Sequence, residues 1–139
     1  MSIFDSPRFD SPRFLRNVLF GDAAITLAAG AVQLLLARPL AQWMNLPAPL
    51  LTGTGIFMLC YAMVVGFVAT RDALPRPIVW LLAVGNFGWV LASVALLAGA
   101  WVTPTIWGMA WVLGQAAIVF VLAELQWTGL RRTPALRLA

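Results

Sequence analysis

Histidine is absent from all 139 residues, and cysteine occurs only once, as Cys60. Imidazole is the commonest protein metal ligand and the usual axial ligand of haem iron, so histidine-ligated haem or zinc within this chain is excluded. A single cysteine cannot form an intrachain disulfide. The sequence therefore predicts no cofactor and no metal site.

Charged residues are also scarce. They make up 10% of the chain, whereas hydrophobic residues make up 62%. A soluble domain needs far more polar and charged side chains on its surface, so this composition is that of an integral membrane protein whose first partner is the lipid bilayer. The net charge of +4 is the difference between nine arginines and five acidic residues, and lysine is absent. Because these arginines cluster at the ends of apolar runs, they indicate membrane topology, and no nucleic-acid partner is predicted.

Sequence signatures of catalysis are missing as well. The chain has no glycine-rich phosphate loop, no serine or cysteine that could pair with a histidine, and no loop long enough to form a catalytic domain. Its two halves lack the internal similarity that is typical of inverted-repeat transporters. We therefore expect a protein that is not an enzyme.

Four apolar runs are present, each near the twenty residues or so that cross about 30 Å of hydrocarbon. They cover residues 15–37, 50–70, 78–100 and 105–127. Prolines in the connecting segments end or begin the helices. The expected fold is all-α, a four-transmembrane-helix antiparallel bundle at 15–130. A cytoplasmic or interfacial leader at 1–14 precedes it, and a basic cytoplasmic tail at 131–139 follows.

Two short segments add detail to this outline. The leader repeats Phe-Asp-Ser-Pro-Arg, and Ser11 before Pro12 is typical of a helix N-cap followed by proline at the first helical position. A helix is therefore expected to begin there. Residues 39–47, between the first two runs, are expected to lie along the membrane surface as a short amphipathic piece.

The distribution of arginine predicts the orientation. Only Arg38 falls on one side of the expected bundle. The others fall on the opposite side: Arg8, Arg13, Arg16, Arg71, Arg76, Arg131, Arg132 and Arg137. Both termini and the middle loop are thus expected in the cytoplasm. The tryptophans expected at the two interfaces are Trp43, Trp80, Trp101, Trp107 and Trp127.

One polar residue in each run falls at a similar depth. These residues are Asp22, Tyr61, Asn86 and Glu124. At a rise of about 1.5 Å per residue, each lies roughly 9 to 15 Å from a marker of the cytoplasmic surface, these markers being Arg16, Arg71, Pro77 and Arg131. We expect them to meet as an intramembrane polar layer, with Arg16, Arg71 and Arg131 as possible charge partners. A layer of this kind either holds the helices together or forms a proton, cation or substrate site.

Helical spacing predicts how the runs pack. The third run carries a stripe of small residues, Gly85, Gly88, Ala92, Ala95 and Gly99. Such a stripe lets two helices approach closely, and Asn86 is expected beside this contact. In the fourth run, Gln115 and Glu124 are about half a turn out of phase, so one of them is expected to face a second subunit or a cofactor. Gln33 and Gln115 are expected to form interhelical hydrogen bonds.

The fourth run ends in Ala-Glu-Leu-Gln-Trp-Thr-Gly-Leu-Arg-Arg at residues 123–132. Together with an acid early in the first run and an asparagine near a tryptophan in the third, this motif resembles a group of small uncharacterised bacterial four-helix integral membrane proteins. The resemblance spans nearly the whole apolar part of the chain. It implies the same architecture and leaves the function open.

The leading functional prediction is a non-catalytic integral inner-membrane protein that acts as an oligomeric or accessory subunit of a larger membrane complex. The alternative is a small transporter, or an ion or proton pathway, that uses the polar layer around Asp22 and Glu124. A third hypothesis is that the protein binds quinone, lipid or pigment in the membrane.

Overall fold

The computed structural model describes residues 12–132, and the regular structure in this range is entirely helical. Its helices are α1 (Pro12–Leu35), α2 (Ala37–Met44), α3 (Ala48–Ala69), α4 (Arg76–Ala98) and α5 (Ile106–Arg132). All except α2 are long and apolar enough to cross a membrane. The prediction of an all-helical chain with four apolar candidate spans is therefore confirmed.

The observed helices differ from the predicted runs at their ends. The first begins at Pro12 and ends at Leu35, and the last continues to Arg132 instead of stopping near Trp127. Basic side chains in a final turn favour this extension because they lie near the negative end of the helix dipole. The predicted N-cap at Ser11, most of the leader and most of the basic tail lie outside the described residues.

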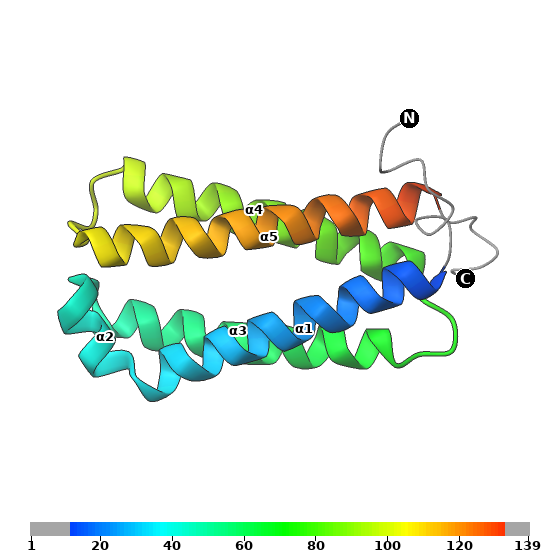
Figure 1. Cartoon of the computed structure of the whole chain (residues 1–139), viewed down its shortest axis with the longest axis horizontal. Helices are drawn as coiled ribbons and strands as arrows, with labels where there is room; N and C mark the ends of the chain where they lie inside the picture. Colours follow the sequence, from blue (N-terminus) through cyan, green and yellow to red (C-terminus); the bar gives the residue numbers. More distant parts are fainter. Residues whose placement is uncertain (1–11, 133–139) are drawn as a thin grey trace.

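The short helix α2 crosses one end of the four long helices (Figure 1). It buries Ala37, Leu40 and Met44 on one face and exposes Arg38 and Trp43 on the other, as an amphipathic helix does.

The end of α2 is tied to the connection between α4 and α5. Asn45 closes α2 in the left-handed conformation, with a φ of 52°. Its Nδ2 donates to the backbone oxygen of Thr103 at 2.6 Å, and the Thr105 hydroxyl donates to the backbone oxygen of Trp43 at 2.9 Å. These bonds fix α2 against the start of α5.

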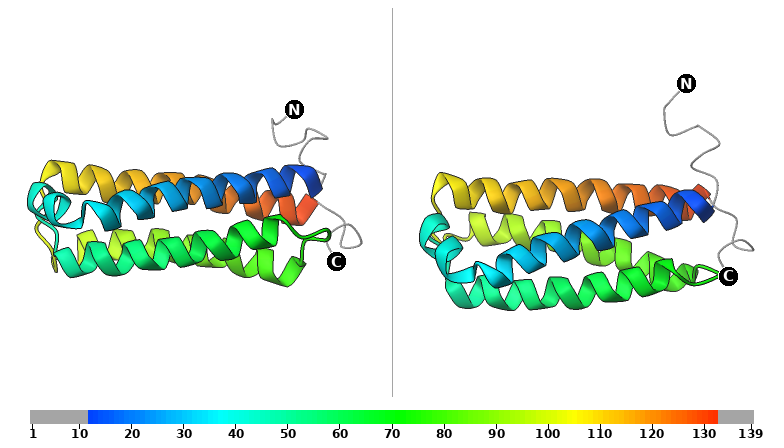
Figure 2. Two further views of the ribbon diagram at one scale, coloured as in Figure 1. Left: turned by 90° about the horizontal axis from the view of Figure 1, so that it is seen from below. Right: turned by 60° about the horizontal axis from the view of Figure 1, so that its bottom comes forward.

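The four long helices form two pairs. The first pair is α1 with α3, the second is α4 with α5, and contact between α1 and α5 joins them. Figures 1 and 2 show the two pairs lying along one another, with α2 at one end and the α3–α4 connection at the other. In contrast, α3 and α4 do not pack closely along their backbones. One side of the molecule therefore stays open between α3 and α4.

Helices α1 and α3 approach each other closely at Gly30 and Gly55. A Cβ atom added at Gly30 would lie 2.9 Å from the Cβ of Met58 and 3.2 Å from the backbone oxygen of Gly55. A Cβ added at Gly55 would lie 3.3 Å from the backbone oxygen of Gly30. The missing side chains let the two backbones come together without lipid between them.

The predicted close contact along α4 is absent from the described residues. All members of its small-residue stripe, Gly85, Gly88, Ala92, Ala95 and Gly99, are exposed. A Cβ at Gly85 or Gly88 would meet nothing within 4 Å. The reason is that α4 buries another face, which includes Leu82, Ala83 and Asn86. This finding corrects the prediction for contacts inside the chain, where Gly30, Gly55 and Gly108 are among the glycines at close contacts.

A Gly30→Val variant should be less stable than the parent by about 1 to 3 kcal/mol, because overpacking a tight helix contact forces the neighbours apart. Gly53→Val is the matched control, since a Cβ at Gly53 meets nothing within 4 Å. Reversible unfolding in mixed micelles measures both variants. Equal losses in the two variants would contradict the assignment of the α1–α3 contact.

Candidate functional site

A buried carboxylate in α1 is the centre of a polar cluster. Asp22 is fully buried, and its Oδ2 atom accepts hydrogen bonds from Gln126 Nε2 at 2.6 Å, Tyr61 Oη at 3.0 Å and Asn86 Nδ2 at 3.1 Å. Its Oδ1 atom accepts from the Thr26 hydroxyl at 3.1 Å. Residues from α1, α3, α4 and α5 are therefore joined at one carboxylate. We call these five residues the Asp22 cluster.

The members of the Asp22 cluster also contact one another. Asn86 Nδ2 donates to Gln126 Oε1 at 3.1 Å, and the Tyr61 hydroxyl lies 2.9 Å from Asn86 Oδ1. All four partners of Asp22 present hydrogen-bond donors to the two carboxylate oxygens. Burial of polar atoms is tolerated when hydrogen bonds replace those lost to water, and this arrangement supplies such bonds.

The structure brings together three members of the predicted polar layer and separates the fourth. Glu124 is exposed, and fully buried Gln126 contacts Asp22 in its place. Glu124 and Gln126 are two positions apart, which corresponds to a rotation of about 200° around the helix axis, so their side chains leave α5 on opposite sides. The sequence contained a sign of this arrangement. Gln126 follows Gln115 by three full turns, whereas Glu124 is half a turn out of phase with Gln115.

The predicted charge partners do not reach the carboxylate of Asp22. Arg16 Nη2 donates instead to the backbone oxygens of Arg71 at 2.6 Å and Asp72 at 3.2 Å, just beyond the end of α3. The Arg71 guanidinium lies 5.5 Å from the centre of the Phe67 ring. Arg76, which was not predicted to take part, donates through Nη1 to the backbone oxygen of Leu130 at 2.8 Å.

The arginines at this end of the bundle thus donate hydrogen bonds to backbone oxygens near the ends of helices. Arg16 and Arg76 bind backbone oxygens that follow or end α3 and α5. Carbonyls at a helix C-terminus lack partners within the helix, and a cationic donor satisfies them. The carboxylate of Asp22 is left to neutral donors.

A second polar cluster surrounds Gln33, nearer to α2. Gln33 is 3% exposed, and its Nε2 atom donates to the backbone oxygen of Leu51 at 3.0 Å and to the Thr54 hydroxyl. Its Oε1 atom accepts from Trp111 Nε1 at 3.1 Å and from Gln115 Nε2 at 3.4 Å. These bonds link α1, α3 and α5, which is the interhelical role expected of Gln33 and Gln115.

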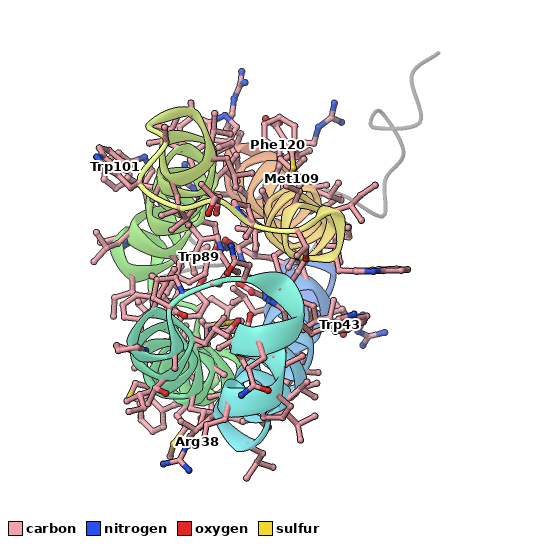
Figure 3. The ribbon with its side chains drawn as sticks, turned by 90° about the vertical axis from the view of Figure 1, so that its left-hand side faces the viewer. Arg38, Trp43, Trp89, Trp101, Met109 and Phe120 are labelled. Carbon is pink, nitrogen blue, oxygen red and sulfur yellow. The ribbon has the colours of Figure 1, made fainter. Side chains whose placement is uncertain are left out.

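An apolar groove of about 580 Å³ lies where α3 and α4 separate. Tyr61 and Asn86 of the Asp22 cluster are part of its lining. The rings of Phe57 on α3 and Trp89 on α4 stack across it, with centroids 5.9 Å apart and an interplanar angle of 6°. Trp89 lies between the two helix pairs in Figure 3, and small residues of α4, Gly85, Gly88 and Ala92, leave the groove unfilled.

Most of the predicted interfacial tryptophans lie on the surface. Trp43, Trp80, Trp101 and Trp107 are exposed, whereas Trp127 is half-buried. The rings of Trp43 and Trp107 stack with centroids 5.3 Å apart and thereby join α2 to α5. In Figure 3, Trp43 and Trp101 lie at the periphery of the molecule.

Within residues 12–132, no group of three histidine, cysteine, aspartate or glutamate side chains could hold a metal ion. The Asp22 carboxylate already accepts hydrogen bonds from four side chains of its own chain. The geometry is that of a tie between helices.

Comparisons with protein-family models, with curated proteins and with solved structures found no match to this chain.

An Asp22→Ala variant should unfold more easily, because it removes the acceptor shared by four helices. Four interhelical or local bonds at about 0.6 kcal/mol each give an expected loss of about 2 kcal/mol. Glu124→Ala is the matched acid-to-alanine control and should leave the stability of the monomer unchanged. Unfolding in mixed micelles compares them, and an equal loss in both variants would contradict the central position of Asp22.

Proposed function

We propose that this chain is a non-catalytic integral membrane protein that acts as an oligomeric or accessory subunit of a larger membrane complex. The observation that carries the proposal is the position of Glu124. This residue lies on the exposed side of candidate span α5 and makes no hydrogen bond or ion pair with another described residue.

Glu124 also lies at some depth along α5. It precedes Arg131 by seven residues, or roughly 10 Å along the helix axis. An ionisable side chain that faces hydrocarbon at this depth is costly, and such residues almost always face a protein interior or a water-filled cavity. A polar group from another subunit would satisfy Glu124. Asp22 needs no such partner, since its donors come from its own chain.

The proposed topology is an antiparallel bundle with both termini in the cytoplasm. Its support is the positive-inside rule, since the α3–α4 connection carries Arg71 and α4 begins at Arg76, whereas Arg38 lies in α2 at the other end of the molecule. We propose the bacterial inner membrane as the location. The resemblance of residues 123–132 to small bacterial four-helix membrane proteins supports this proposed location.

The groove between α3 and α4 favours a second candidate function, the binding of a lipid, quinone or pigment. Its lining is almost wholly apolar apart from groups such as Tyr61 and Asn86, as sites for hydrophobic ligands are. Retention of a lipid, quinone or pigment by the purified chain, and its loss on filling the groove with Gly88→Phe, would favour this candidate.

The transport alternative loses one of its two acids. It depends on Asp22 and Glu124 acting at one layer, and the two side chains lie on opposite sides of α5. A pathway would therefore rest on Asp22 alone. Proton- or cation-coupled flux in liposomes that disappears in Asp22→Asn and survives in Glu124→Gln would revive this alternative.

The subunit proposal predicts that the tagged chain, extracted from native membranes in polymer-bounded lipid discs, has a protein mass above the 15.1 kDa of one copy. The Glu124→Leu variant should shift the population toward single copies, because it removes the group that needs a partner. Mass photometry or native mass spectrometry measures the distribution. Recovery of single copies alone from the parent chain, with no other protein, would overturn the proposal.

The topology predicts which loops react from each side. In a Cys60→Ser background, Asp72→Cys should be shielded from a membrane-impermeant maleimide added to intact spheroplasts, and Thr103→Cys should react. Both positions are exposed in the structure, so access depends on the side of the membrane. Disruption of the membrane should render Asp72→Cys reactive. The reverse labelling pattern in intact spheroplasts would invert the topology.

A further inference from the structure

We infer that the corner between the start of α4 and the end of α5 binds the headgroup of an anionic phospholipid. A hollow of about 360 Å³ lies at this corner, and we call it the α4–α5 hollow. Its lining residues are Arg76, Pro77, Trp80, Trp127, Leu130 and Arg131. The hollow shares no lining residue with the groove between α3 and α4. A lipid site here goes beyond the proposed subunit function and does not depend on it.

The α4–α5 hollow lies at the level where lipid headgroups would meet two candidate spans. Helix α4 begins at Arg76 and α5 ends at Arg132, so the hollow is at the end of both. Trp80 is exposed and Trp127 is half-buried, and neither indole N–H has a hydrogen-bond partner among the described residues. Tryptophan at the end of a span is typical of the membrane interface, where its ring contacts acyl chains and its N–H contacts polar groups.

Two guanidinium groups line the hollow. Arg76 is held in place because its Nη1 atom donates to the backbone oxygen of Leu130 at 2.8 Å. This bond also covers a carbonyl at the negative end of the α5 dipole, which would otherwise repel an anion. Arg131 is exposed and makes no hydrogen bond or ion pair with another described residue. Its N–H donors are therefore open to a phosphate group, which a guanidinium binds in a bidentate manner.

The lining favours an anionic headgroup over a zwitterionic one. Among the described residues that line the hollow, none is acidic, so the amine of a zwitterionic lipid would find no counter-ion there. A neighbouring hollow also includes Arg131, but it contains Glu124, which disfavours a phosphate beside it. Basic pockets at the ends of membrane helices are a recognised setting for anionic headgroups. A phospholipid with one negative charge, such as phosphatidylglycerol, therefore matches the α4–α5 hollow.

The bilayer also favours a lipid over a free phosphate ion. Acyl chains in the hydrocarbon hold the phosphate of a lipid at the level of the headgroups, whereas a free ion has no such anchor. The surrounding surface attracts the same ligand, because Arg38, in α2, is the only described arginine at the other end of the bundle (Figure 1). The α4–α5 hollow adds a defined place in which two guanidinium groups and two indoles surround one space.

Native mass spectrometry of the full chain tests the inference. Micelles of the chain are supplied with equal amounts of phosphatidylglycerol and phosphatidylcholine that carry the same acyl chains, so that only the headgroup differs. The adduct with one phosphatidylglycerol should be several-fold more abundant than the adduct with one phosphatidylcholine. Equal adducts would overturn the inference. Displacement of phosphatidylglycerol by an excess of inorganic phosphate would also overturn it, because the hollow would then be a site for the free anion.

Single substitutions locate the bound headgroup. Arg131→Gln removes a guanidinium that has no described partner, so this variant should fold, and its affinity for phosphatidylglycerol should fall about fivefold. Arg71→Gln is the matched control, because it removes the same charge from an exposed position at the same end of the bundle but outside the hollow. Arg131→Lys should keep most of the affinity, since an ammonium group also binds phosphate. Equal losses in Arg131→Gln and Arg71→Gln would indicate general surface charge and overturn the site.

Other occupants and other lipid positions give different outcomes. Gly88→Phe fills the groove between α3 and α4 and should leave the phosphatidylglycerol adduct unchanged. Loss of the adduct in Gly88→Phe but not in Arg131→Gln would place the lipid in that groove and overturn the inference. A protein complex of the chain that excludes phosphatidylglycerol would overturn the inference and leave the subunit proposal standing. Single copies that retain phosphatidylglycerol would do the reverse.

Discussion

The hydrogen bonds to Asp22 are the interaction on which the bundle depends. They are the only place in the described chain where side chains from α1, α3, α4 and α5 meet at one residue. In hydrocarbon, association of helices gains little from the hydrophobic effect, because lipid is as apolar as leucine. Polar groups and close packing must therefore set the arrangement. Asp22 sets the level at which all four long helices meet.

This constraint explains why the structure has an open side. Gly30 and Gly55 bring α1 and α3 together, and contact between α1 and α5 joins the two pairs. Tyr61 and Asn86 extend inward to Asp22 and contact each other, so α3 and α4 are linked through side chains and need no direct backbone contact. The stacked rings of Phe57 and Trp89 bridge the remaining distance. The groove follows from this indirect connection.

The sequence predicted the depth of polar residues better than their direction. Depth depends on the rise per residue and on the charges that mark the membrane surface, and it placed Asp22, Tyr61 and Asn86 at one level. Direction depends on which face of a helix meets its neighbours. That choice is made by packing, so Glu124 was assigned to a position that Gln126 occupies.

The difference between the position of a residue along a helix and the direction of its side chain also explains why the prediction for the small residues of α4 was wrong. Glycine spacing on α4 matched a close-contact pattern, but spacing alone does not say which helix, if any, fills the space. The observed close contact uses Gly30 and Gly55, which come from two different helices and form no stripe in the sequence. Pairing between distant segments is a property of the folded chain. Four spans and their approximate limits, in contrast, follow from hydropathy and proline positions.

The two intramembrane acids therefore have different physical circumstances. Asp22 has its donors within the chain, and its burial is a cost that folding alone offsets. Glu124 lies on the opposite side of α5 from Gln126, and no described residue hydrogen-bonds to it. The subunit proposal assigns the cover of this outer face of α5 to another molecule. A single helix thus contributes Gln126 to the Asp22 cluster and carries Glu124 on its outer face, and the two residues are separated by a rotation of about 200°.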